Sequence, residues 1–214
     1  MYLILLPIFL ISLYAIYDFW CCVKQSEVGE NFAIDSAKMD YDWDKNPNVI
    51  AIILIDDTTI YYPIVQGGDN KKYLTRDIND NFSVAGSIFL DYRNSRDFSD
   101  NYNIIYGHRM SYGQMFSDIA LFEDRNYFDA RRTATILRAD EEIKLEVIAF
   151  VRISVSSSLY RLESRKFRAD NLSDIRNKAI HYRANDERGR LFILSTCNRS
   201  SKSLRDILVL KECS

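Results

Sequence analysis

The stretch RLFILSTCNRSSKSLRDILVL, residues 190–210, contains two short apolar runs separated by a polar loop. Both runs are rich in Leu, Ile, Val and Phe, and each has the length of a β-strand rather than of a helix. Cys197 ends the first run, and Arg205 stands eight positions later, where the second run begins. We therefore expect Cys197 at a strand end, where a rigid scaffold can present its side chain to a cleft.

Runs of the same kind recur through the chain before this stretch. They are VIAIILID, TIYYPIVQ, AGSIFLDY, NIIYGH, TATILRA and IKLEVIAFVRI, and Asp, Asn, Gly and Ser turns separate them. Eight strand candidates in about 160 residues predict a mainly β domain, either a closed barrel or a sandwich. Two helical insertions are also expected, one over residues 113–124 and one over residues 170–184, which opens with an Asn/Ser-rich cap.

The composition limits what the chain can be. Its 214 residues are 47% hydrophobic and 13% aromatic, which suffices for one sizeable core. Of the four cysteines, Cys21 and Cys22 lie in the apolar N-terminal segment and Cys213 is next to last, so no disulfide framework is expected. The chain has no Cys-x-x-Cys pair. We therefore expect no zinc knuckle. We also expect no other metal and no cofactor.

The N-terminal segment, residues 1–23, carries a single charge, Asp18. It is long enough to cross about 30 Å of hydrocarbon as a helix, and it lacks the basic start and small-residue cleavage site of a secretory signal. We predict a membrane anchor here. Residues 24–47 are polar and acidic and predict a linker with a short helix that ends before Pro47. Residues 48–214 form the predicted globular domain.

Charge is unevenly distributed along the sequence. Residues 152–214 carry 14 basic and 7 acidic side chains, although the whole chain has a net charge of −2. The basic residues alternate with Ser, Asn and Asp rather than with stacking aromatics, and no nucleic-acid motif accompanies them. The pattern indicates a mixed, solvated surface and does not favour nucleic acid as a partner.

A cysteine and a histidine stand at strand-to-loop edges far apart in the sequence. His108 ends the run NIIYGH, and Cys197 ends RLFILSTC. A thiolate paired with an imidazole can attack a carbonyl and protonate the leaving group, and Arg205 offers a permanent charge to an oxyanion. Each also has a simpler interpretation, because a lone cysteine is usually a core residue and an arginine usually a surface one. We expect His181 on a helix surface and Arg199 in solvent.

Together these residues resemble the class B sortases, the membrane-anchored cysteine transpeptidases of Gram-positive bacteria. The resemblance covers roughly residues 45–210 and rests on YYPIVQGGDNKKYL, AGSIFLDYRN, NIIYGHRMSYGQMF and LSTC followed by Arg. It implies an eight-stranded barrel with a histidine after the fourth strand, a cysteine ending the seventh and an arginine opening the eighth. In this sequence, the resemblance assigns these three positions to His108, Cys197 and Arg205. Residues 156–189 leave room for the helix that class B carries between the sixth and seventh strands.

The resemblance also implies an activity and its partners. Such an enzyme cleaves a C-terminal sorting signal after Thr through a thioacyl intermediate and joins a surface protein to an amine of a peptidoglycan precursor. The enzyme is held in the cell membrane by one N-terminal helix, with its catalytic domain outside. The implied substrate contacts are Asn70, Leu74, Ser195 and Thr196. Two features differ from the pattern. Arg109 and Asn198 occupy positions beside the histidine and the cysteine that vary in the family. The loop NRSSKSL lacks the aromatic and acidic residues often found there.

Two other functions fit the same residues. A membrane-tethered cysteine hydrolase would use the same pair with water as the acceptor and would transfer nothing. A non-catalytic β-barrel binding module would keep Cys197 as a structural residue. The product formed with and without an added amine separates the first from a transpeptidase, and the reactivity of Cys197 separates the second.

Overall fold

The computed structural model describes residues 7–17, 20, 43, 46–110, 113–162, 167–183 and 188–213, and for 167–170 only the backbone. Residues 7–17 are helical. No helix among the described residues is both long and apolar enough to cross a membrane. The predicted anchor and linker lie partly outside the described residues, because residues 1–6, 18–19, 21–42 and 44–45 are not among them.

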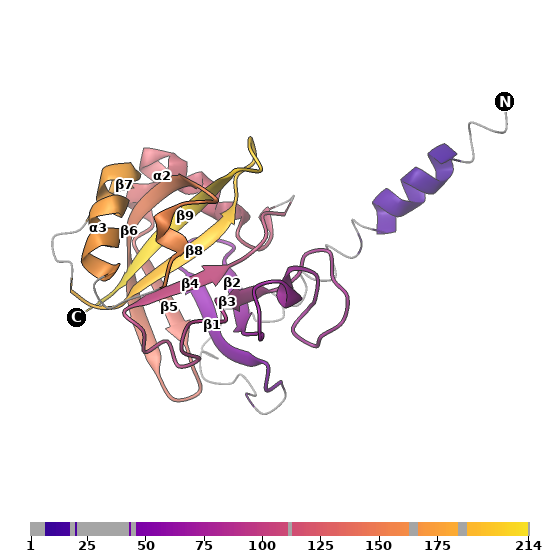
Figure 1. Ribbon diagram of the computed structural model, residues 1–214. Coiled ribbons are helices and arrows are strands. Elements are labelled where there is room, and N and C mark those ends of the chain that lie inside the picture. Colours follow the sequence, from indigo (N-terminus) through magenta and orange to yellow (C-terminus); the bar gives the residue numbers. More distant parts are fainter. Residues whose placement is uncertain are drawn as a thin grey trace. The chain divides into compact units, whose positions relative to one another are not determined.

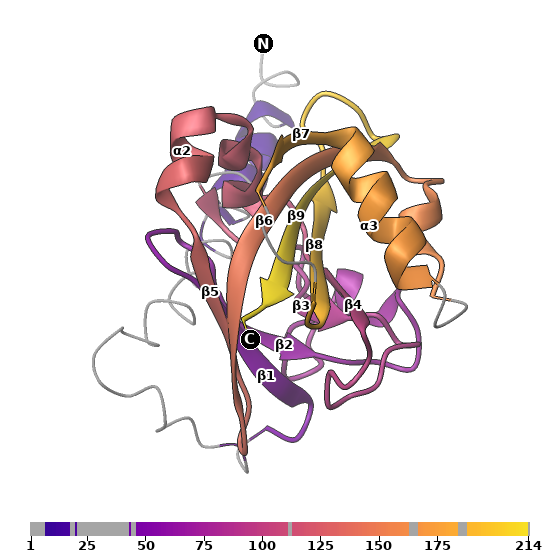
Figure 2. The same ribbon diagram turned by 90° about the vertical axis from the view of Figure 1, so that its left-hand side faces the viewer.

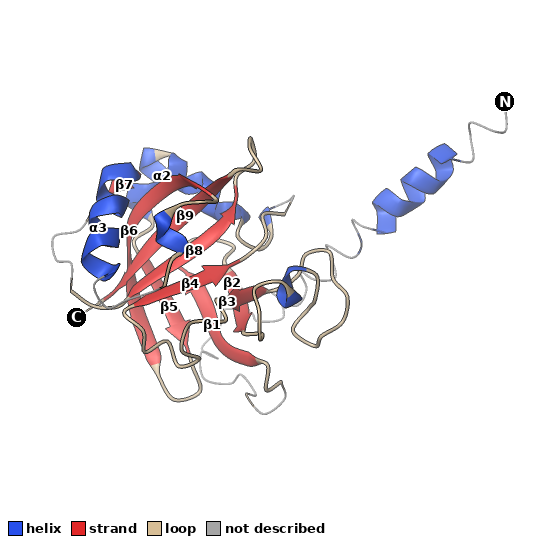
Figure 3. Ribbon diagram, in the orientation of Figure 1, coloured by secondary structure: helices blue, strands red, loops and turns tan. Residues whose placement is uncertain are grey.

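Within the described residues, nine strands form one sheet, and all eight predicted strands are among them (Figures 1 and 3). They are β1 (Val49–Ile55), β2 (Tyr61–Val65), β3 (Ile88–Leu90), β4 (Tyr102–Tyr106), β5 (Thr133–Leu137), β6 (Glu142–Ser154), β7 (Ala179–Tyr182), β8 (Leu191–Cys197) and β9 (Leu204–Glu212). The order is β5-β1-β2-β3-β4-β8-β9-β6-β7, and β5 also pairs with β6. That pairing closes eight strands into a barrel and leaves β7 attached outside.

Both faces of the central strands are buried, which explains their unbroken apolar sequences. In β8, Phe192 and Leu194 belong to the main core cluster, whereas Leu191 and Ile193 belong to a second one. Helix α3 (Phe167–Lys178) covers this second cluster with Leu172 and Ile175 (Figure 2). Each such side chain contributes about 1.5–3 kcal/mol on burial. The helical insertion between β6 and β8 therefore completes a core layer.

The first helical insertion differs from the prediction over residues 113–124. Ser117–Glu123 forms a 3₁₀ helix, η3, and the α-helix α2 begins only afterwards, over Arg125–Ala130. The reason is Asp124, which has extended backbone angles and whose carboxylate accepts a 2.8 Å hydrogen bond from the Tyr127 N–H. Asp124 is thus the N-cap of a new helix rather than the end of the preceding one.

The second insertion is also shifted, and the prediction for His181 is wrong. Helix α3 ends at Lys178, and the next four residues form β7, which pairs with β6 through Phe150 and His181. Pairing with an open strand edge overrides local helix preference here. His181 lies in this strand with its ring 5.3 Å from that of Phe128, and its Nε2 is 2.8 Å from the Glu123 carbonyl.

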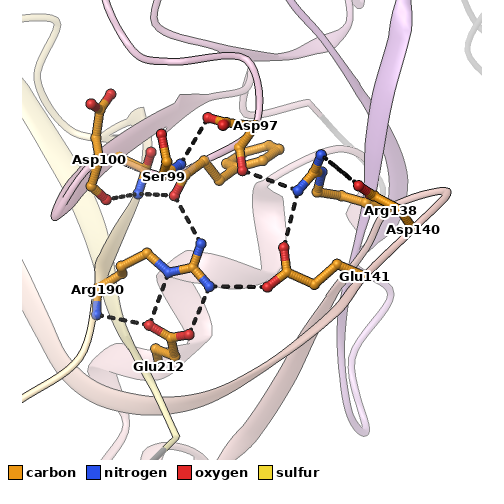
Figure 4. A network of polar contacts seen from close by, with 10 residues as sticks. Asp97, Ser99, Asp100, Arg138, Asp140, Glu141, Arg190 and Glu212 are labelled. Atoms are coloured by element: carbon orange, nitrogen blue, oxygen red, sulfur yellow. Dashed lines mark hydrogen bonds and ion pairs between the residues drawn. The ribbon is translucent and has the colours of Figure 1, made fainter.

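A network of ion pairs and hydrogen bonds connects the C-terminal end of β9 to the start of β8 and to the β5–β6 turn (Figure 4). Arg190 binds Glu212 through its backbone N–H and through Nε and Nη2, the two guanidinium bonds at 2.9 and 2.7 Å. Glu141, in the β5–β6 turn, bridges Arg190 to Arg138. This network lies a whole strand length from the loop that joins β8 to β9, so it supports the barrel from the other end.

Candidate active site

Strand register brings the three predicted catalytic residues to one edge of the barrel. β4 and β8 run parallel with Tyr106 opposite Ser195, so His108 and Cys197 each follow two residues after a matched position. β9 returns antiparallel and places Arg205 directly opposite Cys197. Carboxyl ends of parallel neighbours meet at the same sheet edge, which explains how residues 89 positions apart become neighbours.

Gly107, between β4 and His108, packs closely against neighbouring side chains. A Cβ at this position would lie 2.4 Å from Ile88 Cδ1 and 2.6 Å from the ring of Phe116. The Gly107 N–H donates to the Ser195 carbonyl at 3.1 Å. Glycine is therefore required for packing, and this contact holds the approach to His108 against β8.

These residues surround a cavity of about 360 Å³. All seven predicted site residues line it, and its volume lies within the range of about 300–1,000 Å³ that is typical of ligand pockets. The full lining consists of Asn70, Leu74, Phe89, Tyr106, Gly107, His108, Val155, Tyr160, Ser195, Thr196, Cys197 and Arg205. The structure thus places the thiol, the imidazole and the guanidinium on one cavity.

The contacts of the three groups define their orientation. His108 Nε2 is 2.8 Å from the Leu74 carbonyl, and because a carbonyl can only accept, Nε2 carries the proton. Cys197 is a free thiol and is half-buried. Arg205 Nη1 donates to the carbonyls of Lys202 and Leu204, at 3.0 and 2.9 Å. The arginine is therefore anchored by the loop it follows.

The predicted substrate contacts are not equally accessible. Leu74 is 39% exposed, and Asn70 is partly buried with its amide donating to Asp91 Oδ2 at 2.8 Å. Ser195 and Thr196 are each only 2% exposed. The Ser195 hydroxyl is 2.8 Å from the Tyr160 hydroxyl, whereas Thr196 Oγ1 has no hydrogen-bond partner. Asn70 and Leu74 are thus better placed than the two strand residues to touch a ligand.

A fully buried carboxylate supports this wall of the cavity. Burial alone would raise the pKa of Asp91, but hydrogen bonds from Arg93 and Asn70 outweigh it and hold the pKa below its ordinary value. Asp91 also accepts from the Tyr106 hydroxyl at 3.0 Å. Asp91 therefore orients both the Asn70 amide and the Tyr106 ring.

The sequence reasoning missed the aromatic residues of the site. Tyr160 lies in η4 (Ser158–Tyr160), a short 3₁₀ helix of the insertion between β6 and β8, and its ring stacks on that of Tyr106. Burial raises the pKa of Tyr160 above its ordinary value, while the hydrogen bond with Ser195 and the charge of Arg205 act in the opposite direction. A neutral hydroxyl thus stands between the insertion and β8.

A second cavity of about 560 Å³ also borders Cys197. It is lined by Arg109, Met110, Gly113, Ser117, Asp118, Leu121, Cys197, Asn198 and Arg199. Arg199 lies here, whereas Arg205 lies on the first cavity with His108. This separation supports the choice of Arg205 as the partner of the Cys–His pair. Among the described residues, no cluster of His, Cys, Asp or Glu is arranged to hold a metal ion.

No family model matches the sequence. It is 31% identical over 159 residues to sortase B of Listeria monocytogenes, a match that covers 72% of this chain and 64% of that protein. The matched part therefore spans just under two thirds of the Listeria relative.

Solved structures resemble the chain over a larger share of their length. The crystal structure of sortase B from the type II pilus of Streptococcus pneumoniae is 30% identical, covers 80% of this chain and 96% of that one, and gives a TM-score of 0.68. Sortase B of Clostridium perfringens is 26% identical, with coverage of 80% and 97% and a TM-score of 0.73.

Proposed function

The chain belongs to the class B sortases, and on that premise we propose that it is a cysteine transpeptidase that joins a surface protein to a cell-wall amine. The observation that carries the proposal is the meeting of Cys197, His108 and Arg205 on one cavity. A nucleophile, a proton carrier and a permanent cation are the groups that acyl transfer requires.

In the first half-reaction, the Cys197 thiolate attacks the backbone carbonyl of the Thr in a C-terminal sorting signal. Arg205 stabilises the negative oxygen of the tetrahedral intermediate, and His108 gives its proton to the departing amine. The C–N bond breaks, and the acyl group stays on sulfur as a thioester. This step starts from a thiolate and an imidazolium, because a neutral imidazole would be left as an imidazolate after giving up its proton.

In the second half-reaction, an amine of a peptidoglycan precursor attacks the thioester. His108 accepts a proton from this amine, the C–S bond breaks, and Cys197 leaves as the thiolate. Asn70 and Leu74 would contact the sorting signal in the first cavity, with Ser195 and Thr196 contributing to its wall. No cofactor takes part in this scheme.

We further propose that residues 1–23 anchor the protein in the cell membrane as a single span, with the catalytic domain outside. Its support is the apolar sequence with one charge, together with the exposed apolar side chains of the helix over residues 7–17. Deleting residues 1–25 should release the protein from the membrane fraction and leave peptide turnover intact. A truncated protein that folds but no longer turns over peptide would contradict this assignment.

The experiment that tests the transferase is a product analysis with the full chain in detergent and a peptide library. Mass spectrometry should show a thioacyl adduct on Cys197 and, with an added amine, a ligated peptide in place of the hydrolysed one. The same hydrolysed product with and without amine would establish the hydrolase. If Cys197 reacts with an alkylating probe no faster than a free thiol, and equally in His108→Ala, the binding module is favoured.

A further inference from the structure

The residues that immediately follow the three proposed catalytic residues meet at one buried carboxylate. His108, Cys197 and Arg205 are each followed by a polar or charged side chain. The residue that follows Arg205 lies within β9, where successive residues point to opposite faces, so its side chain lies on the other side of the sheet from the first cavity and the two other followers contact it there. They meet at one point, and they are Arg109, Asn198 and Asp206.

Asp206 is the centre of this cluster and is 0% exposed. Asn198 Nδ2 donates to both of its oxygens, at 2.9 and 3.0 Å. Arg109 Nη1 lies 3.5 Å from Oδ2. Arg109 and Asn198, which occupy positions that vary in the family, therefore contact the same carboxylate.

A fourth strand joins the cluster through Arg152, which lies opposite Asp206 in the pairing of β6 with β9. Arg152 Nε donates to Asp206 Oδ1 at 2.7 Å, and its two Nη atoms bind Glu123 of η3 at 2.9 and 2.8 Å. The hydrogen bonds that Arg152 donates to the carboxylates of Glu123 and Asp206 raise its pKa above the ordinary value. The cation is thus held from both sides.

The cluster spans four neighbouring strands at the end that bears the active site. In barrel order β4, β8, β9 and β6, it takes Arg109 from just after β4, Asn198 from just after β8, Asp206 from β9 and Arg152 from β6. Asp206 is absent from the lining of both cavities. Its carboxylate therefore does not touch a ligand in the first cavity, but its partners Arg109 and Asn198 are the chain neighbours of His108 and Cys197.

Burying a carboxylate is costly, and a buried ion pair adds little net stability compared with apolar packing. What such a group supplies is a defined geometry, because its donors must stay in place to compensate its charge. We propose that Asp206 is a positioning residue that holds His108, Cys197 and Arg205 in catalytic register through Arg109, Asn198 and Arg152. The proposal rests on the transpeptidase function given above.

The test compares Asp206→Asn with Glu212→Gln in the full chain. Both changes remove a carboxylate charge from β9, but Glu212 belongs to the network at the far end of the strand. Asp206→Asn should lower kcat about tenfold to a hundredfold per folded molecule with little change in KM, since small displacements of reacting groups cost this much. Glu212→Gln should lower the melting temperature and leave kcat unchanged.

Asn198→Ala provides a second route if Asp206→Asn folds poorly. It removes one donor and should lower kcat in the same way. Combined with Asp206→Asn it should add less than its separate effect, because both changes break the same contact. Wild-type kcat for Asp206→Asn and Asn198→Ala, or an equal loss of kcat in Glu212→Gln, would overturn the proposal.

A readout without peptide keeps this proposal distinct from the proposed function. The alkylation rate of Cys197 by iodoacetamide depends on the cations near its sulfur. It should fall in Asp206→Asn and stay unchanged in Glu212→Gln, even if the wild-type protein cleaves no peptide. Failure of the wild-type to cleave would refute the transpeptidase, whereas equal alkylation rates in all variants would refute the positioning role.

Discussion

Cys197 lies directly opposite Arg205 in the antiparallel pairing of β8 with β9. Opposed residues of such a pair have Cβ atoms about 4.5–5.5 Å apart, so the thiol and the guanidinium are neighbours because of strand register. Both line the first cavity. The loop over residues 198–203 joins the two strands, and its Lys202 carbonyl accepts a hydrogen bond from Arg205. The position of Cys197 is set by its strand and not by this loop.

Cys197→Ala should abolish peptide cleavage and thioacyl formation, because the nucleophile is lost. The fold should persist, since Cys197 is half-buried at a strand end and losing its sulfur opens no large cavity. Mass spectrometry and circular dichroism measure the two outcomes. Replacing Cys21, Cys22 or Cys213 should leave turnover unchanged, and turnover retained in Cys197→Ala would end the enzyme assignment.

Arg205→Ala should lower kcat by about 10²–10³, as expected for loss of a group that stabilises an oxyanion. Arg205→Lys should recover part of the rate, because an ammonium keeps the charge but not the planar fork. The matched control is Arg199→Ala, an exposed arginine on the second cavity, which should be nearly silent. The assignment would be wrong if Arg199→Ala had a strongly reduced cleavage rate while both Arg205 variants cleaved peptide at the wild-type rate.

Much of the barrel could be predicted from the sequence because its strands are buried on both faces. Runs such as Leu191–Leu194 stay apolar without alternation, since one set of side chains enters the barrel and the other meets α3. The elements that were misassigned depend on distant partners. β7 exists because β6 offers an edge, and α2 starts at Arg125 because Asp124 caps it.

The residues of the candidate site also fall into those that local sequence could predict and those that it could not. His108, Cys197 and Arg205 stand at strand ends that could be recognised from local sequence, and the structure brings them to one cavity. Tyr160 and Asp206 gave no such signal, because a tyrosine in an insertion and an aspartate in a strand have no local pattern that reveals their partners. Only the closed strand order places Tyr160 beside Ser195 and Asp206 beside Arg109.

Acid should destabilise the protein partly through Asp91. Its pKa in the folded state lies below the ordinary value of 3.8, so the unfolded state binds more protons in the window between the two values. The stability that Asp91 contributes is therefore present above pH 3.8 and is lost as the pH falls through its lower folded pKa. Urea unfolding as a function of pH should show a shallower acid slope in Asp91→Asn than in the wild-type.

The same variant should lose about 1.5–3 kcal/mol of unfolding free energy at neutral pH, the contribution of hydrogen bonds to a charged group. Its KM for peptide should also rise, since Asp91 orients Asn70. Asp140→Asn is the control, because its side chain is 72% exposed and a surface ion pair contributes only about 0–1 kcal/mol. Equal stability losses in the two variants would show that Asp91 acts as an ordinary surface carboxylate.

Gly107→Ala tests whether close packing before His108 sets the position of the imidazole. The added Cβ would lie 2.4 Å from Ile88 Cδ1 and 2.6 Å from the Phe116 ring, so one of these neighbours or the backbone must move. Overpacking of this kind costs about 1–3 kcal/mol of unfolding free energy. Because His108 is the next residue, kcat should fall as well, measured at a temperature where both proteins are folded.

Gly68→Ala is the matched control, since nothing lies within 4 Å of its added Cβ, and it should leave stability and kcat near wild-type. A Gly107→Ala protein as stable and as active as Gly68→Ala would show that β4 tolerates displacement here and that His108 is positioned by its bond to Leu74 alone.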